Sequence, residues 1–157
     1  MPTDQHYMQL ALDACRVGVD KGQSPFGACI VSAGGEVLAC THNHVRLLTD
    51  PSAHAEVMAI RDACGKLKDV HLTGATIFST TEPCPMCFTA IHWARIARIV
   101  SAATIADAAS FGFNELPVSN AHLRKVGGAG VELTAEYMRE QAVELYRYWR
   151  DRHGQPY

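Results

Sequence analysis

Residues 83–87 read Pro83-Cys84-Pro85-Met86-Cys87, and an upstream stretch reads His54-Ala55-Glu56. Two cysteines three positions apart at the start of a helix present both sulfur atoms to one point, and a histidine from a second helix can complete a three-ligand zinc site. A zinc site with three protein ligands keeps its fourth position open, which is typical of catalytic rather than structural zinc. Glu56 lies two residues beyond the histidine, where a carboxylate can move protons at that open position. The two motifs together predict a hydrolytic zinc site with ligands His54, Cys84 and Cys87 and with Glu56 as the acid and base.

This pairing of H-x-E with P-C-x-x-C resembles the signature of the cytidine deaminase-like superfamily of zinc-dependent nucleobase deaminases. Within that superfamily the chain is most similar to the guanine deaminase branch, and the resemblance is strongest over residues 51–94 and weakest after residue 115. It implies hydrolysis of guanine to xanthine and ammonia, with one Zn²⁺ per chain. It also implies a homodimer in which residues 135–157 form a C-terminal helix and tail that cover the active site or swap between subunits.

Length and composition limit the class of protein. The chain has 157 residues, of which 48% are hydrophobic and 19% charged, and these values predict a single globular domain over residues 1–157. The formal net charge is −2, and no dense Lys/Arg cluster is present. A small nucleobase substrate is therefore favoured over a nucleic acid, although net charge says nothing of a local basic patch.

The beginning of the sequence shows no basic region followed by an apolar run, and no apolar segment approaches the roughly 18 residues of a membrane span. We therefore expect a cytoplasmic protein whose cysteines are reduced thiols. Cys15 and Cys64 fall in helical patterns, and Cys29 and Cys40 fall in strand patterns, where a buried thiol acts as a small apolar group. Only the pair in the C-x-x-C motif has the spacing of metal ligands.

Hydrophobic periodicity and turn residues predict a regular alternation of elements. The order α-β-β-α-β-α-β-(α)-β-α, which includes a hairpin and a parallel strand-helix-strand crossover, fits a three-layer α/β/α sandwich with a five-stranded mixed sheet. The resemblance implies the same fold. The expected segments are a helix at 4–20, strands at 25–31 and 37–40, a helix at 54–65, a strand at 75–80, a helix at 84–94, a strand at 97–103, a short helix from 107, a strand at 131–134 and a helix at 135–151.

The resemblance also implies residues that contact the substrate. Asn43, at the exit of the second strand, would bond a base edge through an amide that both donates and accepts, although a solvated loop is the alternative. The guanine deaminase branch carries an acidic loop, typically Gly-Phe-Asp-Asp, where this chain has Gly-Phe-Asn-Glu, and a terminal tyrosine that closes the pocket. Phe26 and Trp93 would form ring walls, unless both are simply core aromatics. The implied contacts are thus Asn43, Phe26, Ala55, Trp93, Glu115 and Tyr157, with Glu136 a further acidic candidate.

Several other functions fit parts of the pattern. A tRNA adenosine deaminase shares these motifs and would need a positive surface, part of which could come from Arg139, Arg147, Arg150 and Arg152. Cytosine, guanosine or an aminotriazine would suit the same chemistry. From a different class, C-x-x-C at a strand-to-helix junction is the placement used by thiol redox proteins. A purely structural zinc would instead need a fourth ligand, such as His42, His44 or His92.

Overall fold

The computed structural model describes residues 2–157, and its elements follow the expected alternation of helices and strands. The helices are α1 (Asp4–Asp20), α2 (Val45–Leu48), α3 (Ala55–Leu67), α4 (Pro85–Trp93), α5 (Ile105–Ser110), α6 (Asn120–Gly127) and α7 (Arg139–Asp151). The strands are β1 (Gly27–Val31), β2 (Val37–His42), β3 (Thr76–Thr81), β4 (Arg98–Ala103) and β5 (Glu132–Thr134).

The five strands form one mixed sheet in the order β2-β1-β3-β4-β5. β1 pairs antiparallel with β2, as the hairpin pattern predicts, and it also pairs antiparallel with β3. β3, β4 and β5 are parallel to one another, which confirms the predicted crossover through α4. Parallel strands end at the same edge of a sheet, so the carboxyl ends of β3 and β4 lie next to each other.

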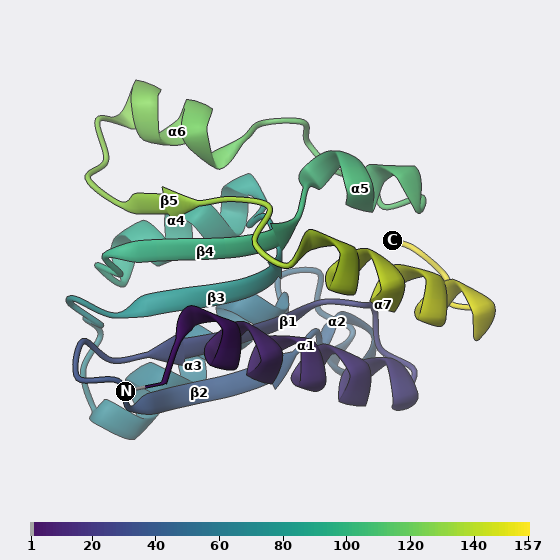
Figure 1. Ribbon diagram of the computed structural model, residues 1–157, viewed down its shortest axis with the longest axis horizontal. Coiled ribbons are helices and arrows are strands. Elements are labelled where there is room, and N and C mark those ends of the chain that lie inside the picture. Colours follow the sequence, from purple (N-terminus) through teal and green to yellow (C-terminus); the bar gives the residue numbers. More distant parts are fainter. Residues whose placement is uncertain (1) are drawn as a thin grey trace.

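Helices cover both faces of this sheet, so the predicted three-layer α/β/α sandwich is confirmed. Figure 1 shows α1 and α7 side by side in front of the strands, with α3 and α4 behind them. The strands between the two layers supply the most deeply buried apolar side chains, among them Ile30, Ile77, Phe78 and Val100, each exposed by 1% or less. Helices on both faces explain why all five residues of β1, Gly-Ala-Cys-Ile-Val, are buried and none is polar.

Three features differ from the sequence-based expectation. The four-residue α2 was not predicted, because it is too short to show a helical period. α6 was not predicted either, although the Ser119 hydroxyl caps its start and Gly128, at φ 62°, ends it. The last helix begins at Arg139 rather than at residue 135, because Glu136 and Met138 adopt positive φ angles that break a helix.

Within residues 2–157, none of the helices combines the length and apolar character that crossing a bilayer requires.

Candidate active site

The three expected zinc ligands meet where two helices begin. His54 occupies the position before the first turn of α3, and Cys84 occupies the same position in α4. Pro85 takes the first helical position of α4, where a missing N–H has no helical partner to lose. Cys87 follows one turn later, on the face that α4 turns toward α3.

The spacing of the ligand atoms fits a zinc ion. His54 Nδ1 lies 3.6 Å from Cys84 Sγ and 3.5 Å from Cys87 Sγ. Tetrahedral coordination with usual Zn–N and Zn–S bond lengths requires N···S separations of about 3.5 Å. Within residues 2–157 these three side chains are the only group of three or more potential ligands gathered this closely. The site would therefore hold Zn²⁺ through His54, Cys84 and Cys87.

A fourth protein ligand is not present in this group, which argues against a purely structural zinc. The His42 ring stacks on that of His44 at 4.4 Å, and its Nδ1 donates to the Asn43 carbonyl oxygen. His44 Nδ1 donates likewise to the carbonyl oxygen of His42. His92 lies in the last turn of α4, at the opposite end from Cys84. None of these three histidines is therefore placed to act as a fourth zinc ligand.

The two cysteine ligands differ in the pKa of their thiols. A hydrogen bond from Cys87 and the neighbouring His54 ring lower the pKa of Cys84 to about 4. The bond to Cys84, together with burial, raises the pKa of Cys87 well above its ordinary value. Burial lowers the pKa of His54, but the negative charges of Cys84 and Glu56 outweigh burial and raise the pKa overall. The start of α4 also favours negative charge. Such a group suits a divalent cation better than a redox pair, because a histidine contacts both sulfur atoms.

Glu56 lies beside this group and is almost fully buried, at 5% exposure. Burial, followed by the charge on Cys84, raises its pKa, while His54 acts in the opposite direction. The Ser79 hydroxyl donates to Glu56 Oε1 at 3.0 Å, and Glu56 Oε2 lies 3.5 Å from Cys87 Sγ. The carboxyl group is therefore next to the zinc ligands without being one of the three.

A cavity of about 260 Å³ opens beside the ligands. It is lined by Pro51, His54, Cys84, Pro85, Met86, Phe113, Asn114, Glu115, Leu116 and Tyr157. Glu115, in the loop between α5 and α6, and Tyr157 therefore both line the cavity, as the resemblance implied. Burial and the negative charge of Cys84 raise the pKa of Glu115 to about 7.

Asn43 is fully buried at the end of β2, and its hydrogen bonds fix the orientation of its amide. Asn43 Oδ1 accepts from the backbone N–H of Val45 at 3.0 Å, and Nδ2 donates to the Tyr157 hydroxyl at 2.7 Å. The sequence suggested an amide that donates and accepts toward the substrate. In the structure the oxygen is used by Val45 at the start of α2, and the NH₂ group donates to Tyr157, which itself lines the cavity.

The C-terminal tail reaches the site of its own chain. Arg46 donates to the backbone oxygen of Gln155 at 2.7 Å, and the Asn114 N–H donates to the Tyr157 backbone oxygen at 3.0 Å. The Tyr157 ring lies 5.3 Å from that of Phe113 and 6.0 Å from that of His54, measured between ring centroids. Burial raises the pKa of Tyr157, so the phenol stays neutral.

The other expected contacts lie outside the lining of this cavity. Phe26 is buried behind it, with its ring 4.9 Å from that of Phe113. Ala55 is fully buried in the first turn of α3. Trp93 is 74% exposed at the far end of α4, about 13 Å along the helix from Cys84. Within one chain Trp93 therefore does not line this cavity, because nine helical residues separate it from Cys84, and its contact with substrate stays a prediction.

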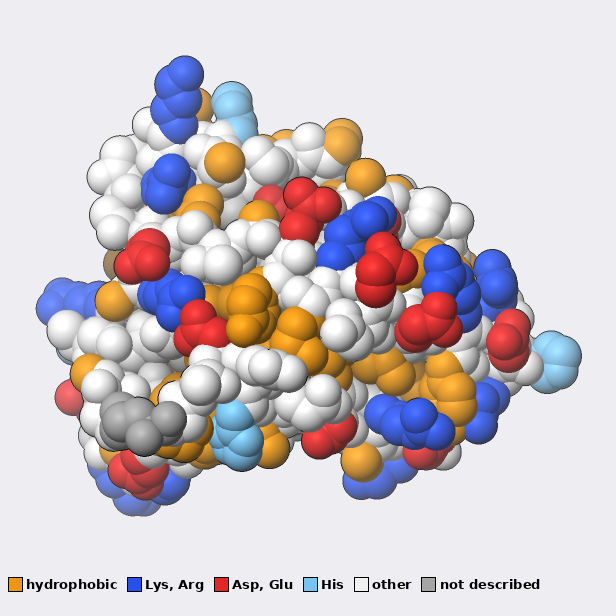
Figure 2. Space-filling model, in the orientation of Figure 1, with side chains coloured by type: hydrophobic (Ala, Val, Ile, Leu, Met, Phe, Trp, Pro, Cys, Tyr) orange, Lys and Arg blue, Asp and Glu red, His pale blue; other side chains and the backbone are white. Residues whose placement is uncertain are grey.

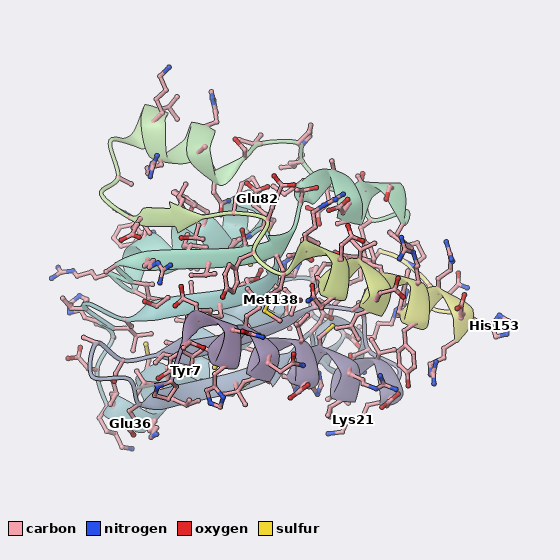
Figure 3. All side chains as sticks on the ribbon, viewed as in Figure 1. Tyr7, Lys21, Glu36, Glu82, Met138 and His153 are labelled. Carbon is pink, nitrogen blue, oxygen red and sulfur yellow. The ribbon has the colours of Figure 1, made fainter. Side chains whose placement is uncertain are left out.

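Sequence reasoning missed residues that hold the site together. Ser79 contacts Glu56, and Asn120 donates through Nδ2 to the Pro83 carbonyl oxygen at 2.6 Å, just before the first cysteine ligand. The Asn120 backbone N–H also donates to Glu82, which Figure 3 labels at the edge of the sheet near α5. A polar residue inside an apolar strand was a signal for Ser79. Nothing in the sequence marked Asn120, since α6 itself was not predicted.

Fold and site together define a class of protein. The family model of the cytidine and deoxycytidylate deaminase zinc-binding region matches residues 1–103, which is more than half of the chain. The chain therefore belongs to this family of zinc-dependent deaminases, and the resemblance seen in the sequence is confirmed.

Individual relatives divide between two activities. A guanine deaminase of Bacillus subtilis is 42% identical over 110 residues, which are 69% of this chain and 70% of that protein. A tRNA-specific adenosine deaminase of Aquifex aeolicus is 38% identical over 99 residues, which are 63% of this chain and 65% of that protein. A protein solved in complex with 2,6-diaminopurine superimposes with a TM-score of 0.90 at 26% identity, over 100% of this chain and 86% of the other.

Proposed function

We propose that the protein hydrolyses guanine to xanthine and ammonia. The observation that carries this proposal is that Glu115 and Tyr157 line one cavity beside the zinc ligands, while the Asn43 NH₂ group donates to the hydroxyl of that tyrosine. A carboxylate accepts hydrogen bonds from ring N–H groups, and an amide NH₂ donates to a carbonyl oxygen or a ring nitrogen. Guanine offers a ring N–H flanked by a carbonyl group and an amino group, whereas adenine has no carbonyl group and cytosine has no ring N–H beside its amino group.

Different residues of the site bind the metal and transfer protons. His54, Cys84 and Cys87 would hold Zn²⁺, which would act as a Lewis acid that makes a water molecule nucleophilic near neutral pH. The Glu56 carboxylate takes a proton from that water and delivers it to the ring nitrogen beside the amino-bearing carbon. It then carries a proton to the departing amino group, which leaves as ammonia. One carboxyl group can serve both transfers, because burial raises its pKa and so favours the protonated form that the second transfer requires.

The aromatic side chains around the cavity favour a free base. Phe113 and Tyr157 line it together, and Tyr157 occupies the position at which the tail meets Asn43. A planar purine gains stacking contacts from such rings. The tail in this position leaves little room for a base that is still attached to a polynucleotide, so a small molecule is the better fit.

The arginines that could have bound tRNA are engaged in ion pairs. Arg139 pairs with Asp107 at 2.6 Å, Arg147 pairs with Glu144, and Arg152 lies 3.8 Å from Asp20. Figure 2 shows blue and red side chains alternating over α7 rather than a continuous basic stripe. A surface that binds an anticodon loop needs uncompensated positive charge. The tRNA-specific relatives nevertheless make a tRNA substrate the second candidate.

An ammonia-release screen of the zinc-loaded protein tests the proposal. The panel contains guanine, guanosine, cytosine, adenine, an aminotriazine and a tRNA with adenosine at the wobble position. We expect the highest kcat/KM for guanine, and Glu56→Gln should lower kcat by about 10²–10⁴-fold with its zinc content unchanged. Preferred turnover of another substrate would overturn the assignment to guanine. Full activity in the Glu56 variant would overturn the mechanism itself.

The homodimer implied by the resemblance also remains a proposal. Exposed apolar side chains gather on and next to α4 and α6, including Trp93, Leu116 and Val126. Their burial between two copies would remove apolar surface from water. Light scattering of the purified protein would give the mass directly, and a monomer at micromolar concentration would refute the dimer.

A further inference from the structure

Two cysteines outside the active site face one another at the edge of the sheet. Cys29 on β1 and Cys40 on β2 are direct partners in the antiparallel register. Residues opposite each other in such a pair point to the same face, with Cα atoms about 4.5–5.5 Å apart. Disulfide bonds span Cα separations of about 4.4–6.8 Å. The strands therefore already hold these two residues at bonding distance, and both thiols are free.

The pair lies on the face of the sheet that α1 covers. Cys40 Sγ is 3.3 Å from the Leu10 carbonyl oxygen of α1, and Figure 1 shows this helix in front of β1 and β2. The zinc ligands on α4 lie behind the opposite face. A reaction at Cys29 and Cys40 is therefore separated from the metal site by the thickness of the sheet.

The two thiols have different environments. Cys29 is fully buried, whereas Cys40 is exposed on the edge strand. A hydrogen bond from the Cys29 thiol lowers the pKa of Cys40, although partial burial and the nearby Asp13 oppose this effect. The same bond, together with burial, raises the pKa of Cys29. Cys40 is accordingly the thiol that a reagent meets first, and Cys29 is the buried thiol behind it.

We propose that Cys29 and Cys40 form a reversible dithiol–disulfide pair that reacts with small disulfides such as oxidised glutathione. The Cys40 thiolate attacks one sulfur of the reagent, which breaks the reagent's S–S bond, releases one small thiolate and leaves a mixed disulfide on Cys40. Cys29 then gives up its proton and attacks the Cys40 sulfur, which releases the second small thiol. Two electrons and two protons pass to the reagent. The products are one protein disulfide and two small thiols.

Peptide mass mapping tests this proposal. The zinc-loaded protein is equilibrated in glutathione buffers of increasing oxidised fraction, alkylated and digested with trypsin. Cleavage after Lys21 and Arg46 leaves both cysteines in one peptide, residues 22–46. We expect that peptide to appear without alkyl groups and lighter by two hydrogens than the unalkylated dithiol form. Treatment with a reductant before alkylation should restore two alkylation sites.

Three variants test whether the disulfide joins Cys29 and Cys40 in particular. Cys29→Ala should accumulate glutathione on Cys40, Cys40→Ala should show no adduct in this peptide, and Cys64→Ser should form the disulfide as the unmodified protein does. Circular dichroism of each variant checks that it folds. If the peptide of the unmodified protein stays fully alkylated, or carries as much glutathione as that of Cys29→Ala, the pair does not close and the proposal is wrong.

Discussion

At the residue scale, Glu56 must hold a proton at one stage of the reaction and lack it at another. The Ser79 hydroxyl lies 3.0 Å from Glu56 Oε1 and 2.6 Å from the Thr81 carbonyl oxygen. A hydroxyl has one hydrogen, and a carbonyl oxygen only accepts. Ser79 can donate to the Glu56 carboxylate, or it can donate to Thr81 while accepting from protonated Glu56. Both protonation states of the acid are thus held in the same position.

Ser79→Ala should lower kcat by roughly tenfold, because Glu56 loses the partner that positions it, while general acid–base catalysis as a whole contributes 10²–10⁴-fold. KM and zinc content should stay the same. The matched control is Ser24→Ala, a buried serine whose hydroxyl has no hydrogen-bond partner within residues 2–157. Steady-state kinetics and metal analysis of both variants provide the measurement. Equal loss of activity in the two would show that the Ser79 contact is not specific.

The titration of Glu115 predicts that the activity rises with pH. Its pKa is raised to about 7, so below that pH the side chain is protonated and loses an acceptor for substrate N–H groups. Bound zinc carries positive charge, which stabilises the carboxylate and moves this transition to lower pH. The kcat/KM for guanine should therefore rise with pH between about 5 and 7.

In Glu115→Gln this part of the rise should vanish, because glutamine does not titrate, and KM should increase by about tenfold. pH profiles of the two proteins, measured side by side, test the prediction. Identical profiles would remove Glu115 from substrate recognition.

At the scale of elements, the site is built at junctions rather than within helices or strands. The starts of α3 and α4 supply the zinc ligands, the end of β2 supplies Asn43, and the loop between α5 and α6 supplies Glu115. The C-terminal tail then crosses these junctions. Within the tail, Gly154 packs directly against Trp149 of α7, so a Cβ atom at this position would overlap the indole ring.

Gly154→Ala should displace the tail and with it Tyr157, which raises KM by about tenfold through loss of the hydrogen bond to Asn43. Gly127→Ala is the control, because an added Cβ there meets no atom within 4 Å. Kinetics should separate the two variants, whereas their far-ultraviolet circular dichroism should match. An unchanged KM in Gly154→Ala would mean that the tail does not contribute to substrate binding.

At the scale of the whole molecule, zinc binding and folding are coupled. The three ligands come from α3 and α4, which the chain brings together only when β3 takes its place in the sheet. An ion that binds the folded state alone stabilises that state, by about 2.7 kcal/mol at a concentration one hundred times its Kd.

Removal of zinc with a chelator should therefore lower Tm by about 5–10 °C for a protein of this size. Cys84→Ser, which lacks one ligand, should melt at a temperature that the chelator changes little. Differential scanning calorimetry with and without the chelator measures both. A melting temperature of the unmodified protein that does not respond to zinc removal would contradict a site that is formed by folding.

Local chemistry is what the sequence determined by itself. Ligand spacing, turn residues and apolar periodicity each act over a few residues, so the zinc ligands, the acid Glu56, the hairpin and the parallel crossover could all be predicted without coordinates. The loop that carries Glu115 could be predicted only through the family resemblance, because its single carboxylate has no local signature.

Contacts between distant segments were decided only by the tertiary structure. The Asn43–Tyr157 hydrogen bond joins residues 114 positions apart, and the Asn120–Pro83 bond ties an unpredicted helix to the ligand loop. The exposure of Trp93 was likewise decided by packing, since its helix could be predicted but the side of that helix left uncovered could not. Side chains separated by tens of residues meet only after the sheet and its covering helices have packed, and no local pattern in the chain encodes that final geometry.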